Sequence, residues 1–140
     1  MKFLSFFLVF IAVGFGGCVT SPPVISPAAA RDIALVPMSS ASVTVRPPLL
    51  RQRDGRLELV GFVTKVYGAK TTERTHLDVT FLDSSGETLQ TQTVLFSPQR
   101  LTRGHRAPNR QASYAIAIDA LPTGTRRIEV RAHDEPHMLP

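Results

Sequence analysis

Hydrophobic residues alternate with polar residues from about residue 41 onward, and this period of two is the feature that most constrains the fold. Leu77, Val79 and Phe81 fall on one face of their segment, and Ile128 and Val130 do the same near the C-terminus. A strand with one buried face has this period, whereas an amphipathic helix repeats every 3.6 residues. No segment carries a helical stripe. The sequence therefore predicts an all-β fold.

Turn-forming residues divide the alternating region into six predicted strands: 41–47, 57–67, 74–83, 88–96, 113–119 and 126–132. Asp83–Gly86 is typical of a tight turn, in which Gly86 can adopt a positive φ. The alternation loses phase near Gly61, where a β-bulge would restore it. Six or seven short strands in about 95 residues predict one antiparallel β-sandwich domain.

Two motifs resemble the immunoglobulin-like domains of small bacterial envelope lipoproteins. Gly61-Phe62-Val63 precedes a segment from Leu77 to Gly86 that reads apolar-x-apolar-x-Phe-x-Asp-x-x-Gly. This arrangement resembles the group named for its Phe-x-Leu-Tyr-Asp motif. The resemblance implies an immunoglobulin-like sandwich, but a shared fold does not by itself imply an activity.

The first 17 residues have the features of an export signal. Met1 and Lys2 give a positive start, and Phe3–Val13 is an apolar core of about eleven residues, shorter than the roughly 20 of a spanning helix. The segment ends in Phe15-Gly16-Gly17-Cys18, which resembles the lipobox of bacterial lipoproteins. That resemblance implies cleavage before Cys18 and a diacylglyceryl group on its thiol. The alternative is an uncleaved anchor or a signal without lipid.

The expected lipid determines the expected location. Several acyl chains anchor a chain stably, since each buried CH₂ contributes about 0.8 kcal/mol. Val19 stands where some lipoproteins carry an Asp that retains them in the inner membrane. We therefore expect a lipid-anchored protein of the cell membrane or outer membrane, with the outer membrane favoured, that faces the periplasm or the cell surface.

Proline, alanine and serine are frequent in the segment after Cys18. The expected organisation is a signal peptide at 1–17, the lipidated Cys18 with a flexible tether at 18–40, a sandwich domain at 41–134 and a tail at 135–140. A flexible tether of this length reaches about 25 Å. Alternatively, Ile33–Val36 docks on the domain as an edge strand.

Two predicted loops carry most of the positive charge, and the chain has a net charge of +5. The arginines of the first loop are Arg46, Arg51, Arg53 and Arg56. Those of the second loop are Arg100, Arg103, Arg106 and Arg110. If every connection reverses direction, the loops lie at opposite ends, about 25 Å apart, which exceeds the Debye length of about 8 Å. Neither loop contains an aromatic residue, so no nucleic-acid groove is expected.

The same reversal places the second loop at the end of the sandwich where the tether arrives. Its four arginines would then contact anionic lipid head groups, or else they are solvated. The four histidines are also expected at that end: His76, His105, His133 and His137. With a neighbouring carboxylate they could form a surface Zn²⁺ or Cu²⁺ site, or else they are exposed or hydrogen-bonded imidazoles.

Nothing in the sequence indicates catalysis. It contains no GxSxG or HExxH motif and no glycine-rich phosphate loop, and its single cysteine is assigned to the lipid. We expect no cofactor apart from that lipid. The sequence thus predicts a membrane-anchored lipoprotein that acts as a non-catalytic binding or structural module and docks to another envelope component. The alternative is a metal-binding envelope lipoprotein, and a hydrolase is a third possibility.

Overall fold

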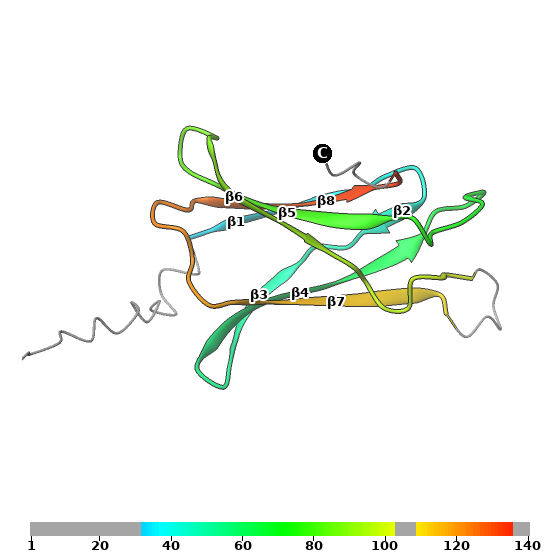
Figure 1. Cartoon of the computed structure of the whole chain (residues 1–140), viewed down its shortest axis with the longest axis horizontal. Coiled ribbons are helices and arrows are strands. Elements are labelled where there is room, and N and C mark those ends of the chain that lie inside the picture. The colour runs from blue at the N-terminus through cyan, green and yellow to red at the C-terminus, as the bar shows by residue number, and fades with distance from the viewer. Residues whose placement is uncertain (1–31, 103–108, 136–140) are drawn as a thin grey trace, which may run out of the picture.

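The computed structural model of the chain describes residues 32–102 and 109–135, which form two β-sheets packed face to face (Figure 1). Within these residues there is no helix, and therefore none that could cross a membrane. The predicted all-β fold is confirmed. The eight strands are β1 (Ala34–Met38), β2 (Val43–Val45), β3 (Leu49–Arg53), β4 (Arg56–Lys65), β5 (His76–Leu82), β6 (Thr88–Val94), β7 (Gln111–Ile118) and β8 (Arg127–His133).

The first sheet has the strand order β1-β8-β5-β6. β5 pairs antiparallel with both β6 and β8, and the expected turn joins β5 to β6. In that turn Asp83 Oδ1 accepts hydrogen bonds from the backbone N–H groups of Ser85 (2.8 Å) and Glu87 (2.9 Å), and Gly86 has φ +87°. β1 lies on the outer edge and runs parallel to β8.

The second sheet is built around β4. β7 pairs with one edge of β4 from Leu57 to Thr64, so β2 and β3 must share the other edge. They are two parts of one strand that Pro47 and Pro48 interrupt, because a proline cannot donate to a β-ladder. Arg46 N–H still donates to Phe62 O at 2.9 Å, so the interrupted strand stays against β4.

The core fills the space between the two sheets. Its fully buried side chains come from both layers and include Val43, Leu59, Val63, Leu77, Val79, Phe81, Ile128 and Val130. Phe96 is buried as well, in the segment that leaves β6 and crosses to the second sheet (Figure 1). There Ser97 and Ser113 exchange two backbone hydrogen bonds of 2.8 and 2.9 Å. This crossing links the sheets along one side of the sandwich.

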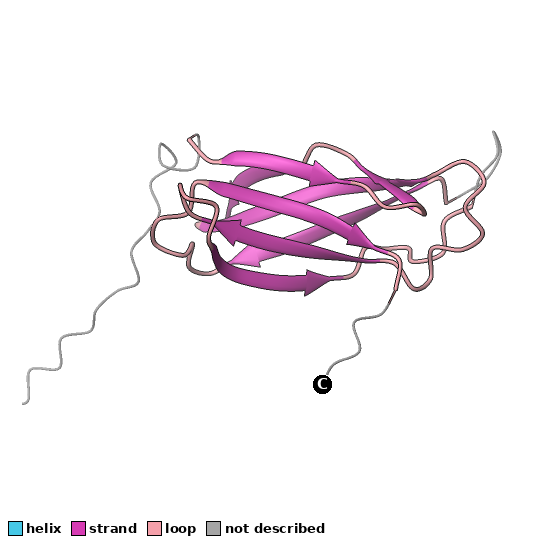
Figure 2. Cartoon of the chain, turned by 90° about the horizontal axis from the view of Figure 1, so that it is seen from above, coloured by secondary structure: helices cyan, strands magenta, loops and turns pink. Residues whose placement is uncertain are grey.

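The connections gather at the two ends of the strands (Figure 2). The turns 53–56, 83–87 and 119–126 lie at one end, together with the residues that lead into β1; we call this the entry end. The opposite end, which we call the loop end, holds the β1–β2 turn, the β4–β5 loop, the β6–β7 connection and the end of β8. As predicted, each hairpin or crossover reverses the chain.

The tether was predicted to continue to residue 40, but the domain begins earlier. Residues 34–38 form β1, so the alternative in which Ile33–Val36 docks as an edge strand is the one that the structure confirms. Ala34 pairs with Arg127 at the start of β8, so β1 begins at the entry end and runs to the loop end. The chain must then reverse direction once more, before β2. The chain therefore enters at the end opposite the second arginine loop, and the prediction that tether, arginines and histidines share one end is wrong.

The second correction concerns residues 49–53, which were expected to lie in a loop and instead form a strand. Residues 49–53 form β3 and pair with β4 through a two-residue turn at Asp54-Gly55. Both turn residues have positive φ, 50° and 77°, as a type I′ hairpin requires. The Asp-Gly pair was the signal that could have revealed this hairpin. The polar run Arg51–Arg53 hid it, because these side chains are exposed.

The bulge predicted at Gly61 does not occur. β4 and β7 pair without a break from Leu57↔Ile118 to Thr64↔Gln111, and Leu59, Gly61 and Val63 all face the core. The apparent loss of phase arises because Phe62, on the outer face, is also apolar and 47% exposed. Gly61 is required for space, since a Cβ atom there would collide with the ring of its cross-strand neighbour Tyr114. Burial raises the pKa of the Tyr114 hydroxyl to about 12.

We therefore expect Gly61→Ala to lower the free energy of unfolding by about 2 kcal/mol, because the added methyl group displaces the buried ring. Urea unfolding measures this change. The control is the same substitution in a Tyr114→Ala background, where the methyl group has room and should cost little. An equal cost in both backgrounds would show that the ring does not explain the glycine.

Candidate functional site

A carboxylate ties three segments together at the loop end. Asp134, just after β8, accepts hydrogen bonds from Ser40 Oγ (2.7 Å), the Ser42 backbone N–H (3.2 Å) and Thr75 Oγ1 (3.1 Å). These donors belong to the β1–β2 turn and to the end of the β4–β5 loop. Burial raises the pKa of Asp134, but the hydrogen bonds outweigh burial and leave the pKa below its usual value. The charged form thus holds the loop end together.

A buried hydroxyl joins the β4–β5 loop to the β6–β7 connection. Thr72 is 1% exposed, and its Oγ1 donates to Gln99 O at 2.6 Å while accepting from the Leu101 N–H at 3.0 Å. Thr75 N–H donates to Thr72 O at 3.1 Å, which connects this contact to the Asp134 junction. The two longest connections at the loop end are therefore fixed relative to each other.

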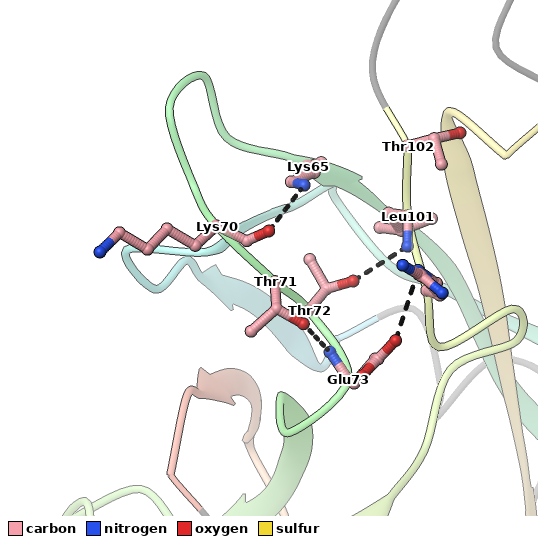
Figure 3. Close-up of a pocket in the computed structure, with 8 residues that line it drawn as sticks. Lys65, Lys70, Thr71, Thr72, Glu73, Leu101 and Thr102 are labelled. Atoms are coloured by element: carbon pink, nitrogen blue, oxygen red, sulfur yellow. Dashed lines mark hydrogen bonds and ion pairs between the residues drawn. The ribbon is translucent and has the colours of Figure 1, made fainter.

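An open pocket of about 550 Å³ lies between these two connections (Figure 3). Its lining residues are Lys65, Lys70, Thr71, Thr72, Glu73, Arg100, Leu101 and Thr102. Lys65 Nζ donates to Lys70 O at 3.4 Å, and Arg100 Nε lies 3.4 Å from Glu73 Oε1. Three cations and one carboxylate thus surround a site whose remaining polar groups are mostly hydroxyls.

The structure brings two of the four predicted histidines together. His76 and His133 are cross-strand neighbours on β5 and β8, with stacked rings whose centroids are 5.5 Å apart. His133 Nε2 lies 3.4 Å from Asp78 Oδ2, and the other oxygen of Asp78 accepts from Thr93 Oγ1 at 2.7 Å. These side chains form a polar cluster on the outer face of the first sheet.

The other predicted ligands, His105 and His137, lie outside the described residues. In the part of the chain that the structure describes, no three His, Cys, Asp or Glu side chains are arranged to hold a metal ion. The four-histidine metal site stays a prediction.

The predicted surface arginines divide in the same way. Arg100 and Arg110 are exposed at the loop end, and Arg103 and Arg106 lie outside the described residues, as does Cys18. Because the chain enters at the opposite end, the geometric argument that these arginines contact the anchoring membrane no longer holds. Arg100 instead contributes to the pocket, together with Lys65 and Lys70, which the sequence analysis did not single out.

Comparisons with protein-family models, curated proteins and solved structures found no match to this chain. Its site is therefore interpreted from its own geometry.

Asp134→Asn is expected to lower the free energy of unfolding at neutral pH by about 1 kcal/mol, near the lower end for charged hydrogen bonds because water reaches the site. The pKa of Asp134 is lower in the folded chain than the unfolded value of about 3.9. Its contribution is therefore complete above that value and disappears as the pH falls through the folded pKa.

Urea unfolding as a function of pH measures this difference, which should narrow below about pH 4. Asp119→Asn, an exposed carboxylate at the entry end, is the matched control and should change stability little. A constant difference down to about pH 2 would argue against the charged form as the stabilising one.

Thr72→Val should cost about 1–3 kcal/mol of stability, because it leaves Gln99 O and the Leu101 N–H without their buried partner. Thermal unfolding and amide hydrogen exchange at Leu101 would record the change. Thr71→Val, at the exposed neighbouring position, should have a much smaller effect. Equal effects at both positions would contradict the role assigned to the Thr72 hydroxyl.

Proposed function

We propose that this chain is an exported lipoprotein, anchored through acyl chains on Cys18, whose immunoglobulin-like domain acts as a non-catalytic binding module of the cell envelope. The lipobox resemblance of Phe15–Cys18 supports the anchor. The absence of an Asp after Cys18 favours the outer membrane. The domain would face the periplasm or the cell surface and bind another envelope component through its loop end.

One observation carries this proposal, namely the direction in which β1 runs. Ala34 N–H donates to Arg126 O at 2.9 Å, next to the start of β8, and Met38 lies opposite Arg131 further along that strand. The chain that follows the lipid therefore reaches the domain at the entry end. Strands of seven to ten residues span about 23–33 Å, so the loop end would lie farther from the membrane than the entry end by about that distance.

The sheet topology supports the immunoglobulin-like assignment. β5 and β8 are paired at the centre of the first sheet although β6 and β7 separate them in sequence, and the crossing at Ser97 moves the chain between the sheets. Such crossings are typical of immunoglobulin-like sandwiches, in which loops grouped at one end often bind the partner. The loop end has this arrangement, with its two longest connections fixed by Thr72.

The outer face of the second sheet offers a further contact surface. Leu49 is 59% exposed and pairs with Val60, beside the exposed Phe62. Exposed apolar side chains grouped in this way are typical of sites that contact other macromolecules. This face supports a binding or structural role.

The anchor is tested by mass spectrometry of the protein isolated from its native membrane. We expect an N-terminal fragment that begins at Cys18 and carries lipid, and we expect Cys18→Ser to lack both the cleavage and the lipid. Ser21→Ala is the matched control and should be processed normally. Recovery of Met1 on the native protein, or a Cys18 without lipid, would contradict the anchor.

The orientation is tested separately on the anchored chain. A fluorescent residue at position 55, in the entry-end hairpin, should be quenched by a quencher in the lipid more strongly than one at position 67, in the β4–β5 loop. Stronger quenching at position 67 would show that the domain does not present its loop end away from the membrane.

A further inference from the structure

The pocket at the loop end combines positive charge with hydroxyl groups on two segments that are fixed to each other. We infer that it binds a phosphate ester, that is, a phosphate group carried by a larger molecule. This inference rests on the proposed function, because it names the ligand class for the end of the domain that the anchored chain would present.

The walls of the pocket are held in place before any ligand arrives. Thr72 contacts both Gln99 and Leu101 on the opposite wall, at 2.6 and 3.0 Å. On that wall, Thr102 N–H donates to Asn109 O at 2.8 Å. A site whose backbone is already ordered loses less conformational entropy on binding.

The charges of the pocket favour an anion. Lys65, Lys70 and Arg100 oppose the single carboxylate of Glu73, which leaves a formal charge of +2. Lys65 Nζ makes one hydrogen bond to a carbonyl, and an ammonium group has three N–H donors. Arg100 pairs with Glu73 through Nε, at 3.4 Å. The side chain of Lys70 extends away from the other lining residues (Figure 3), so it stands at the edge of the pocket.

The arrangement of donors fits phosphate better than carboxylate. A carboxylate group is planar, and one arginine can pair with both of its oxygens. Arg100 already pairs with a carboxylate of this chain, that of Glu73. A phosphate group has oxygens in several directions and accepts from ammonium, guanidinium and hydroxyl donors that surround it. The pocket lining provides the ammonium group of Lys65, the guanidinium group of Arg100 and the hydroxyl group of the exposed Thr71. Its volume of about 550 Å³ leaves room for the rest of an ester.

The test titrates the full chain, in a nonionic detergent, with glycerol 3-phosphate and follows binding by calorimetry and by NMR of the amides at 71–73 and 100–102. Lys65→Gln and Arg100→Gln should each weaken binding about 5- to 10-fold, since each removes one charged contact. Glu73→Gln should strengthen binding about 2- to 5-fold, because it releases Arg100 and removes the repelling charge. Because Glu73→Gln should change the affinity in the opposite direction to the other two variants, the three together separate a specific site from damage to the fold.

Arg56→Gln is the matched control, because it removes the same charge from the entry end. It should leave the affinity unchanged. A loss of affinity equal to that of Lys65→Gln would show that net charge alone attracts the anion, and this result would overturn the inference. Acetate that binds as tightly as glycerol 3-phosphate would overturn it as well, as would the absence of binding at millimolar phosphate.

Vesicles of phosphatidylcholine with and without phosphatidylglycerol distinguish the source of the phosphate group. Acyl chains on Cys18 would insert into both kinds of vesicle, so the site is measured by the difference in binding between them. Binding to glycerol 3-phosphate with no preference for the anionic vesicles supports a soluble or polymer-linked ester. A preference for the anionic vesicles that Lys65→Gln abolishes supports the same phosphate site with a lipid head group as its source. The anchor itself is tested by mass spectrometry, so its failure is distinguished from failure of this site.

Discussion

The parallel pairing of β1 with β8 determines how the rest of the molecule is oriented. Without β1, the chain would enter the sandwich beside the long loops, and those loops would face whatever holds the N-terminus. With β1 in place, five residue pairs from Ala34↔Arg127 to Met38↔Arg131 carry the chain the length of the sheet before the first turn. β1 also covers the outer edge of β8, so the same pairing protects a central strand. Stability and orientation therefore depend on one edge strand.

Much of the fold could be predicted from the sequence, because burial on one face leaves a direct trace in the spacing of apolar residues. The alternation in β7 and β8 matches the burial observed, and the turn at Asp83–Gly86 has the expected geometry. In β5 the predicted inward residues Leu77, Val79 and Phe81 are buried, but so are most of the residues between them. Segments that are paired but little buried left no such trace: β3 is mostly exposed, and β1 is only partly buried and contains Pro37. The Asp54-Gly55 turn shows that local turn chemistry can reveal a strand that hydrophobicity hides.

The candidate site was predicted less well, because it is made by contacts between residues far apart in the chain. Asp134 and Ser40 are separated by 94 positions, and Leu101 and Thr72 by 29. A threonine that satisfies two buried backbone groups looks, in sequence, like any loop threonine. Arg100 of the second arginine loop lines the pocket, but Lys65 and Lys70, which reach the same place from β4 and the loop that follows it, were not expected there. Only the three-dimensional arrangement brings them together.

The polar contacts of the loop end form one continuous network that connects the first strand to the pocket. Ser40, directly after β1, donates to Asp134, and Asp134 also accepts from Thr75. Thr75 is bonded through its backbone to Thr72, which holds both walls of the pocket. Because a partly satisfied polar network is costly where it is buried, loss of one member weakens the others. β1, at which the chain enters the domain, is thus connected through hydrogen bonds to the pocket at the opposite end.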